Sequence, residues 1–245
     1  MCWCIFFLPK VKSINLHFRF VRRPDRRLHK DFWKYTSPVL GNELVWGIGF
    51  TMYSVIMGHL GSDAVAANSI ASIAKKLVVC FCMGLASGGG ILVGNKLGAG
   101  ELSQAKEYGA RLCRIAVISG LITGGVLICI TPAVLHFTNL TAISEEYLLA
   151  MLIMNSINIV GQSVNVMTIS GIFCAGGDSK FGFWCDAVVM WCITVPLGLI
   201  SAFVLKLPVI AVYCIVNADE MIKLPAVFRN YKKYLWVKDL TVKED

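Results

Sequence analysis

GLASGGGILVGNKLGAGELSQAKEYGARL, residues Gly84–Leu112, is the stretch that decides the fold of this chain. An apolar helix with glycines at positions 84, 88, 89, 90 and 94 leads into a short polar turn, and a second helix starts near Glu101. Each glycine inside a soluble helix costs about 1 kcal/mol relative to alanine. Small residues, however, let membrane helices pack closely. The stretch therefore predicts two packed membrane helices joined by a polar loop.

Composition indicates a polytopic membrane protein. Hydrophobic residues make up 56% of the 245 residues and charged residues 16%, with a mean hydropathy of +0.68, whereas soluble domains average about 25% charged residues. A bilayer core needs about 20 apolar residues per helix. The first eight residues, MCWCIFFL, are too short to cross; we interpret them as the end of a missing helix, with a short anchor as the alternative. Six predicted spans follow, at about Phe32–Leu60, Ala64–Gly94, Gln104–Ile130, Glu146–Ala175, Lys180–Leu205 and Pro208–Phe228.

The distribution of the basic residues predicts the orientation. The formal charge is +8. Lys and Arg gather before the first span, in the loop after the second span, and from Lys223 to the C-terminal end, whereas the alternate loops contain Lys206 alone. The positive-inside rule therefore places both termini and the glycine loop in the cytoplasm. Basic ends of this kind orient a protein and contact anionic lipid, so nucleic acid is not an expected partner.

Glu43 is the first candidate functional residue, because ionisable groups inside membrane spans are expensive. It follows Asn42 and Pro38, and helical spacing places Trp46 and Tyr53 on or near its face. A carboxylate beside aromatic rings holds an organic cation by charge and cation–π attraction, or exchanges a proton or sodium ion. The alternative places Glu43 near the cytoplasmic end of its helix, where it is solvated or caps the helix.

Asp186 is the second candidate. It lies about two turns into the fifth span, between Trp184 and Trp191 and before Pro196. At 1.5 Å per residue it lies about 9 Å deep, so the alternative is that it pairs with a basic side chain of a loop. Pro196 is expected to kink the helix.

The fourth span carries a stripe of amides. Asn155, Asn158, Gln162 and Asn165 follow i, i+3, i+7 and i+10, so they share one face of a helix. Such a face lines a water-filled cavity or contacts other helices, where amides bind a ligand or hold helices together. Both interpretations stay open.

Two further groups of charges need an explanation. Lys75 and Lys76 lie about 18 Å along the second span at 1.5 Å per residue, which is too deep for easy snorkelling. At least one of them is expected to face a cavity or pair with an acid. Asp219, Glu220 and Pro225 interrupt the last span, which is therefore expected to be short, tilted or partly interfacial.

The residue pattern does not favour an enzyme or a metal protein. Most of the ten cysteines fall within or beside spans, where they act as small packing residues. The sequence shows no His cluster for zinc, no nucleophile and base pair, and no phosphate loop after a strand. We therefore expect no catalytic residues, no bound metal and no cofactor.

The glycine loop resembles a conserved loop of the multidrug and toxic compound extrusion (MATE) transporters, where it joins the second and third helices of each lobe. The same resemblance extends over most of the chain from about Asp31 onward. The matching residues are Gly94, Asn95, Leu97, Gly98, Ala99, Gly100 and Ala105, together with SPVLGNELVW (37–46), AANSIA (66–71), AGGDSKFGFW (175–184) and YKKYLWVKDLT (231–241).

This resemblance implies an all-α lobe, since MATE transporters have two six-helix lobes arranged as an inverted V. The chain looks like the second lobe. Residues 1–30 then hold the end of a missing helix and a basic linker, residues 31–230 the six-helix lobe, and residues 231–245 a cytoplasmic tail. Partners would be the lipid bilayer, a small organic substrate and a complementary N-terminal lobe or second copy. The expected location is the plasma membrane.

The resemblance also implies a function, half of a secondary antiporter exporting cationic or amphipathic compounds in exchange for Na⁺ or H⁺. In many members an acidic residue of the first span lies eight positions after the proline, where this chain has Trp46. Some members also have an aspartate in the helix that matches the fourth span, where this chain has Gln162 and Ser163. Truncation to a non-transporting fragment or interaction subunit is one alternative. A lipid-linked oligosaccharide flippase, which Lys75 and Lys76 would favour, is another. The binding candidates are Glu43, Asp186, Asn42, Trp46, Asn155, Asn158, Gln162, Asn165 and Lys75, with Pro38 and Pro196 as hinges.

Overall fold

The computed structural model describes residues 26–138 and 140–238, and every regular element in these ranges is a helix. The predicted all-α class is therefore confirmed. The chain divides into two compact units, Met1–Ser37 and Pro38–Asp245, and the second unit contains the helical bundle. The predicted end of a helix at residues 1–8 lies outside the described residues.

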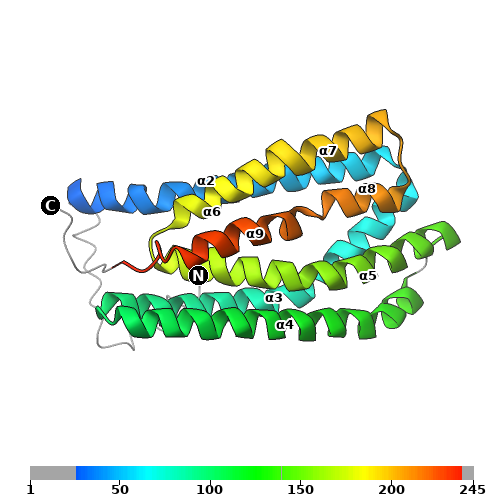
Figure 1. Ribbon diagram of the computed structural model, residues 1–245. Coiled ribbons are helices and arrows are strands. Elements are labelled where there is room, and N and C mark those ends of the chain that lie inside the picture. Colours follow the sequence, from blue (N-terminus) through cyan, green and yellow to red (C-terminus); the bar gives the residue numbers. More distant parts are fainter. Residues whose placement is uncertain (1–25, 139, 239–245) are drawn as a thin grey trace, which may run out of the picture. The chain divides into compact units, whose positions relative to one another are not determined.

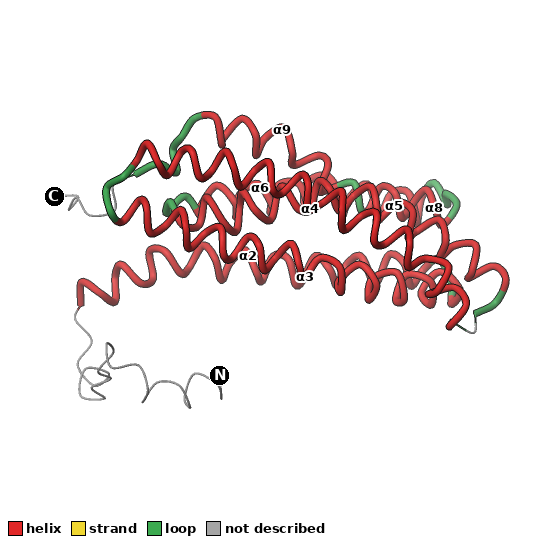
Figure 2. Tube along the Cα trace, turned by 90° about the horizontal axis from the view of Figure 1, so that it is seen from below, coloured by secondary structure: helices red, strands yellow, loops and turns green. Residues whose placement is uncertain are grey.

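The helices follow one another up and down the bundle, joined by short loops (Figures 1 and 2). Several are compound, because an α-helix continues directly into a π-helix, labelled η. The elements in order are α2 (Arg26–His59), α3 (Ser62–Gly98), α4 (Leu102–Phe137), α5 (Ala142–Asn165), η3 (Val166–Phe173), α6 (Ser179–Val188), η4 (Val189–Thr194), α7 (Val195–Leu199), η5 (Ile200–Val204), α8 (Val209–Val216) and α9 (Asp219–Lys232).

Five helical segments among the described residues are long and apolar enough to cross a membrane. They are Thr36–His59, Ser62–Gly98, Leu102–Phe137, Ala142–Phe173 and Ser179–Val204. The sixth predicted span, residues 208–228, is instead divided between α8 and α9, with a break at Asn217 and Ala218. A complete sixth crossing therefore stays a prediction.

Glycines bring α4 close to α5. A Cβ atom added at Gly124 would lie 2.6 Å from the carbonyl oxygen of Ser156, and one added at Gly120 would lie 2.8 Å from the Cα of Val160. A Cβ added at Gly90 of α3 would likewise lie 3.0 Å from the carbonyl oxygen of Gly171 in the π-helix η3. The close packing expected of the glycine-rich stretch is therefore present at Gly90, but a Cβ at Gly84 would meet nothing within 4 Å.

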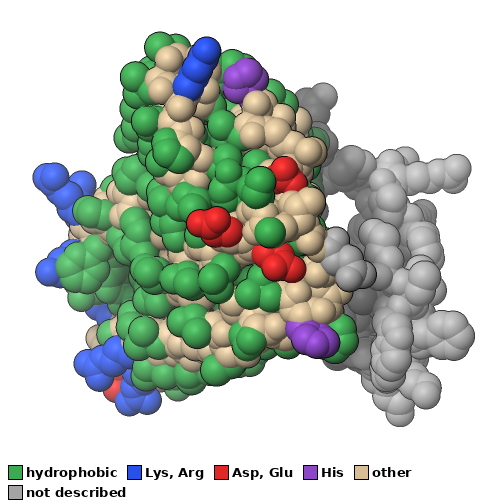
Figure 3. Space-filling model, turned by 90° about the vertical axis from the view of Figure 1, so that its right-hand side faces the viewer, with side chains coloured by type: hydrophobic (Ala, Val, Ile, Leu, Met, Phe, Trp, Pro, Cys, Tyr) green, Lys and Arg blue, Asp and Glu red, His purple; other side chains and the backbone are tan. Residues whose placement is uncertain are grey.

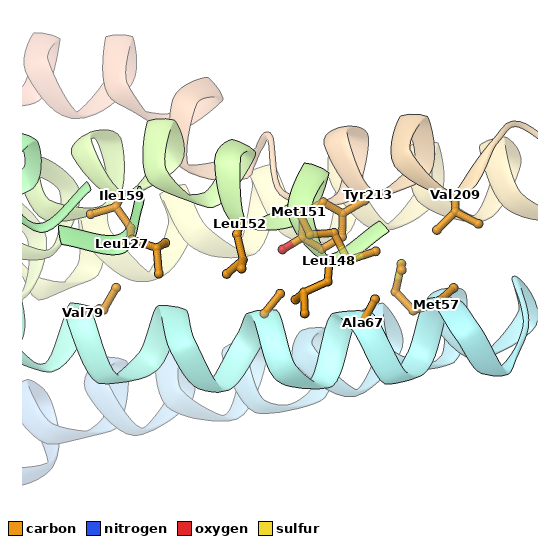
Figure 4. Close-up of a cluster of buried hydrophobic side chains, with 12 residues drawn as sticks. Met57, Ala67, Val79, Leu127, Leu148, Met151, Leu152, Ile159, Val209 and Tyr213 are labelled. Carbon is orange, nitrogen blue, oxygen red and sulfur yellow. The ribbon is translucent and has the colours of Figure 1, made fainter. Parts of the chain in front are cut away.

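A buried hydrophobic cluster holds α8 against the bundle (Figure 4). Val209 and Tyr213 of α8 pack with side chains of α5 and α3, and Leu148 and Met151 of α5 are fully buried there. This cluster positions the start of α9, which begins three residues after α8 ends.

A second buried cluster closes the opposite end of the bundle. Trp236, which follows α9, is fully buried. Its ring packs parallel to that of Tyr231 at 5.7 Å, and Gly109 of α4 leaves room for it. The segment after α9 is thus folded onto the bundle up to this tryptophan.

The turns at the two ends of the bundle differ in charge. The α3–α4 and α5–α6 connections lie at one end, near Lys96, Lys106 and Lys180. Figure 3 faces the other end, where hydrophobic side chains cover much of the surface and acidic side chains lie near its centre. The assignment of the basic end to the cytoplasm stays a prediction.

Candidate functional site

A cavity of about 470 Å³ lies between α2, α3, α5, α6, α8 and α9. Polar and charged side chains line it beside aromatic rings. A space of this size is in the range of small-molecule sites, which occur between the helices of bundles.

The α2 side of the cavity is acidic and aromatic. Glu43, Trp46, Phe50 and Tyr53 follow a helical repeat and all line the cavity. The Trp46 and Phe50 rings stack at 5.9 Å. Glu43 is exposed, and within the described part of the chain it makes no ion pair. Its carboxylate is therefore open to a ligand.

The α5 stripe divides into two parts. All four amides are buried, but Gln162 and Asn165 line the cavity, whereas Asn155 and Asn158 do not. Asn155 faces Tyr213 of α8. The half of the stripe nearer the basic end thus faces a cavity, and the other half contacts neighbouring helices.

Asp186 lies in a buried ion cluster. The Lys223 Nζ donates a hydrogen bond to Asp186 Oδ1 at 3.0 Å, and it lies 3.4 Å from a Glu220 carboxylate oxygen and 3.6 Å from one of Asp219. These four side chains are each less than 10% exposed. We call them, Asp186, Asp219, Glu220 and Lys223, the carboxylate–lysine cluster.

The alternative for Asp186 was a pair with a basic side chain of a loop, but its partner in the structure is Lys223 inside α9. Lys223 was also counted among the cytoplasmic basic residues, but its side chain is 3% exposed in the bundle. The signal in the sequence was the spacing of Asp219, Glu220 and Lys223, which places opposite charges at i+3 and i+4 on one helix face.

Other groups connect this cluster to the cavity. The Asn165 Nδ2 donates to Glu220 Oε2 at 2.8 Å, and Asn42 lies beside Asp186. The Lys75 Nζ donates to Asn217 Oδ1 at 3.5 Å, at the break between α8 and α9. Lys75, Asn42 and the three carboxylates of the cluster all line the cavity.

The remaining residues are Lys76, which was expected with Lys75 to face a cavity or pair with an acid, and the two predicted hinge prolines. The Lys76 Nζ lies 5.0 Å from the centre of the Phe50 ring, and Lys76 lines the cavity. Pro38 lies inside α2, and Pro196 lies in α7 directly after the π-helix η4. The hinge roles of both prolines stay predictions.

The family model MatE matches residues 38–221, three quarters of the chain. The chain belongs to the MATE family. A curated MATE relative, the multidrug resistance protein NorM of Aliivibrio fischeri, is 26% identical over 207 residues, which cover 79% of this chain and 42% of NorM. The chain therefore spans less than half the length of that relative.

Solved structures show the same MATE fold. An outward-facing multidrug resistance MATE family transporter of the MOP superfamily matches with a TM-score of 0.80 and 17% identity, covering 98% of this chain and 53% of that chain. The Vibrio cholerae MATE transporter VcmN in the bent form matches with a TM-score of 0.81 and 14% identity, covering 98% and 54%. The chain corresponds to about half of each structure, and it is a multi-pass membrane protein.

Proposed function

We propose that this chain is one half of a secondary multidrug antiporter that exports cationic or amphipathic organic compounds in exchange for Na⁺ or H⁺. The observation that carries the proposal is the acidic and aromatic wall of the cavity. Glu43 has no ion-pair partner among the described residues and shares its helix face with Trp46 and Phe50. Such a wall attracts an organic cation by charge and by cation–π interaction.

The charge balance of the whole cavity supports a cationic substrate. Its lining contains four carboxylates and three lysines, so one negative charge is left when all are ionised. The carboxylates are Glu43, Asp186, Asp219 and Glu220, and the lysines are Lys75, Lys76 and Lys223.

A complementary lobe belongs to this proposal. Alternating access moves one repeat or bundle against another around a site between them. The proposed opposing surface is a separate N-terminal lobe or a second copy of this chain in the plasma membrane, with the basic end of the bundle in the cytoplasm.

The flippase alternative rests on Lys75 and Lys76, which would contact the phosphates of a lipid-linked oligosaccharide. The contacts give it less support, because Lys75 donates to Asn217 and Lys76 lies over the Phe50 ring. A non-transporting fragment is the remaining alternative, and the experiment below decides between it and a transporter.

The test measures binding and efflux of a fluorescent cationic dye in vesicles that contain this chain together with its complementary lobe. We expect Glu43→Gln to weaken dye binding and slow efflux. Glu146→Gln is the matched control, because Glu146 is exposed and lies outside the cavity. Equal efflux by both variants would refute the role of Glu43, and no efflux by the wild-type pair would favour the non-transporting alternative.

A further inference from the structure

One lysine of the cavity is held by an aromatic ring alone. Three lysines line the cavity, Lys75, Lys76 and Lys223. Lys75 donates a hydrogen bond to Asn217, and Lys223 contacts three carboxylates. Lys76 makes no hydrogen bond or ion pair with any residue that the structure describes, and its Nζ lies 5.0 Å from the centre of the Phe50 ring. The position of this ammonium group therefore depends on a cation–π contact without a second anchor.

We infer that Lys76 is a built-in competitor of the organic cation, which has to displace this ammonium group from the Phe50 ring in order to bind there. The inference rests on the proposed function, because it concerns the same acidic and aromatic wall. A cation on that wall is attracted by the faces of the rings, and Lys76 already lies over one of them. The cavity thus holds a cation of its own where a foreign cation would bind.

The Trp46 ring is less suited to such an exchange. The Lys223 Nζ lies 5.7 Å from the centre of this ring, but the Lys223 side chain is 3% exposed and contacts the three carboxylates of the carboxylate–lysine cluster. Separating a buried charge from its partners is costly. The exchange of one cation for another is therefore expected at Phe50.

Lys76 can leave the ring at low cost. The residue is exposed, and a lysine ammonium is carried on a flexible four-carbon stem. Phe50 is itself 37% exposed, so the contact is open to a ligand. A cation–π contact at an exposed site changes an equilibrium constant by only about two- to five-fold. An organic cation that covers more of the ring than one ammonium group can therefore replace it.

The charges on the wall also favour an exchange. Glu43 lies seven positions before Phe50, which is about 10 Å along the helix α2, and it forms no ion pair with Lys76. The lysine is thus held over a ring and not on the acid. One ammonium group leaves the ring as one organic cation arrives, so the number of positive charges at the ring stays the same.

A double-mutant cycle tests the inference through the binding of ethidium, a flat aromatic monocation. Binding is followed by dye fluorescence with the full chain in nanodiscs of zwitterionic lipid, and the signal of empty nanodiscs is subtracted. We expect Lys76→Met to tighten binding by about two- to five-fold. In the Phe50→Leu background the contested ring is absent, so the same replacement of Lys76 should change binding much less.

Two further variants separate the ring contact from other effects. Lys106→Met is the matched control, because the Lys106 Nζ lies 5.0 Å from the centre of the Tyr234 ring but outside the cavity. It removes an equal charge and should leave ethidium binding unchanged. Lys76→Arg keeps a cation that stacks on aromatic rings, so it should bind ethidium no more tightly than the wild type, even if a variant of Phe50 fails to fold.

Three results would contradict this reasoning. Equal tightening by Lys76→Met with and without the Phe50 ring would overturn the inference, because it would indicate general charge repulsion. Unchanged or weaker binding in Lys76→Met would overturn it as well. If neither the wild type nor Lys76→Met binds ethidium, the cation site of the proposed function is itself refuted, and the inference that rests on it fails too. Binding by Lys76→Met alone would support both.

Discussion

Replacing Lys223 by methionine tests whether the carboxylate–lysine cluster stabilises the fold. Methionine keeps most of the apolar stem but removes the ammonium group, which lies within 3.6 Å of three carboxylates. Removing one partner of a buried ion pair costs about 3–5 kcal/mol, because the other charge stays buried without compensation. Lys75 remains nearby as a counter-charge, so the full cost is not expected. We expect Lys223→Met to lower the free energy of unfolding by about 4 kcal/mol, the middle of this range.

The assay is reversible unfolding in detergent micelles, followed by circular dichroism. Lys96→Met is the matched control, because Lys96 pairs with Glu101 at 2.8 Å but the two side chains are 30% and 41% exposed. An exposed ion pair contributes about 0–1 kcal/mol. Both substitutions remove an ion pair between a lysine and a carboxylate. The expected difference in the free energy of unfolding is therefore due to the burial of the Lys223 pair.

A double-mutant cycle with Asp186→Asn separates the direct interaction from general damage. The two residues touch, so we expect their effects to be non-additive by about 1–3 kcal/mol. The reasoning is refuted if Lys223→Met destabilises no more than Lys96→Met, or if its effect adds to that of Asp186→Asn without coupling. Either result would show that the cavity solvates the cluster well enough to replace the ion pairs.

Two further pairs of substitutions test the packing of the bundle by thermal unfolding. Gly124→Ala should destabilise by about 1–3 kcal/mol because of overpacking against Ser156, whereas Gly125→Ala, which meets nothing within 4 Å, should be neutral or stabilising. Trp236→Ala should cost about 3–5 kcal/mol, since the ring is fully buried; Trp184→Ala, at a ring that is 64% exposed, should cost less than about 1 kcal/mol. Equal losses within either pair would contradict the packing.

Hydrophobicity was enough to predict most of the helices. Long apolar runs fix the positions of α3 and α4, because a bilayer core requires uninterrupted apolar segments. The alignment of Glu43, Trp46 and Phe50 was also predictable, since residues of one helix at i, i+3 and i+7 share a face whatever surrounds it. What the sequence did not contain was the identity of the helices opposite that face.

The carboxylate–lysine cluster was missed for that reason. Counting basic residues near the last span assigned Lys223 to the cytoplasmic side, but the count does not distinguish a solvated lysine from one buried beside an acid. Asp186 and Lys223 are separated by 37 positions, and their contact depends on the packing of α6 against α9. The two interpretations of the amide stripe stayed open for a similar reason, because periodicity placed Asn155 and Asn165 on one face without showing that the cavity ends between them.

The same charges account for the break between α8 and α9. Each charged residue at the centre of a single inserted helix costs about 2.5–3.5 kcal/mol, and α9 has Asp219, Glu220 and Lys223 within its first turns. The eight apolar residues of α8 are too few to cross a bilayer by themselves. The segment is therefore stable only where Asp186 and Asn165 of the preceding helices meet its charges. It follows that mutations of Asp186 weaken the docking of α9 as well as the cluster.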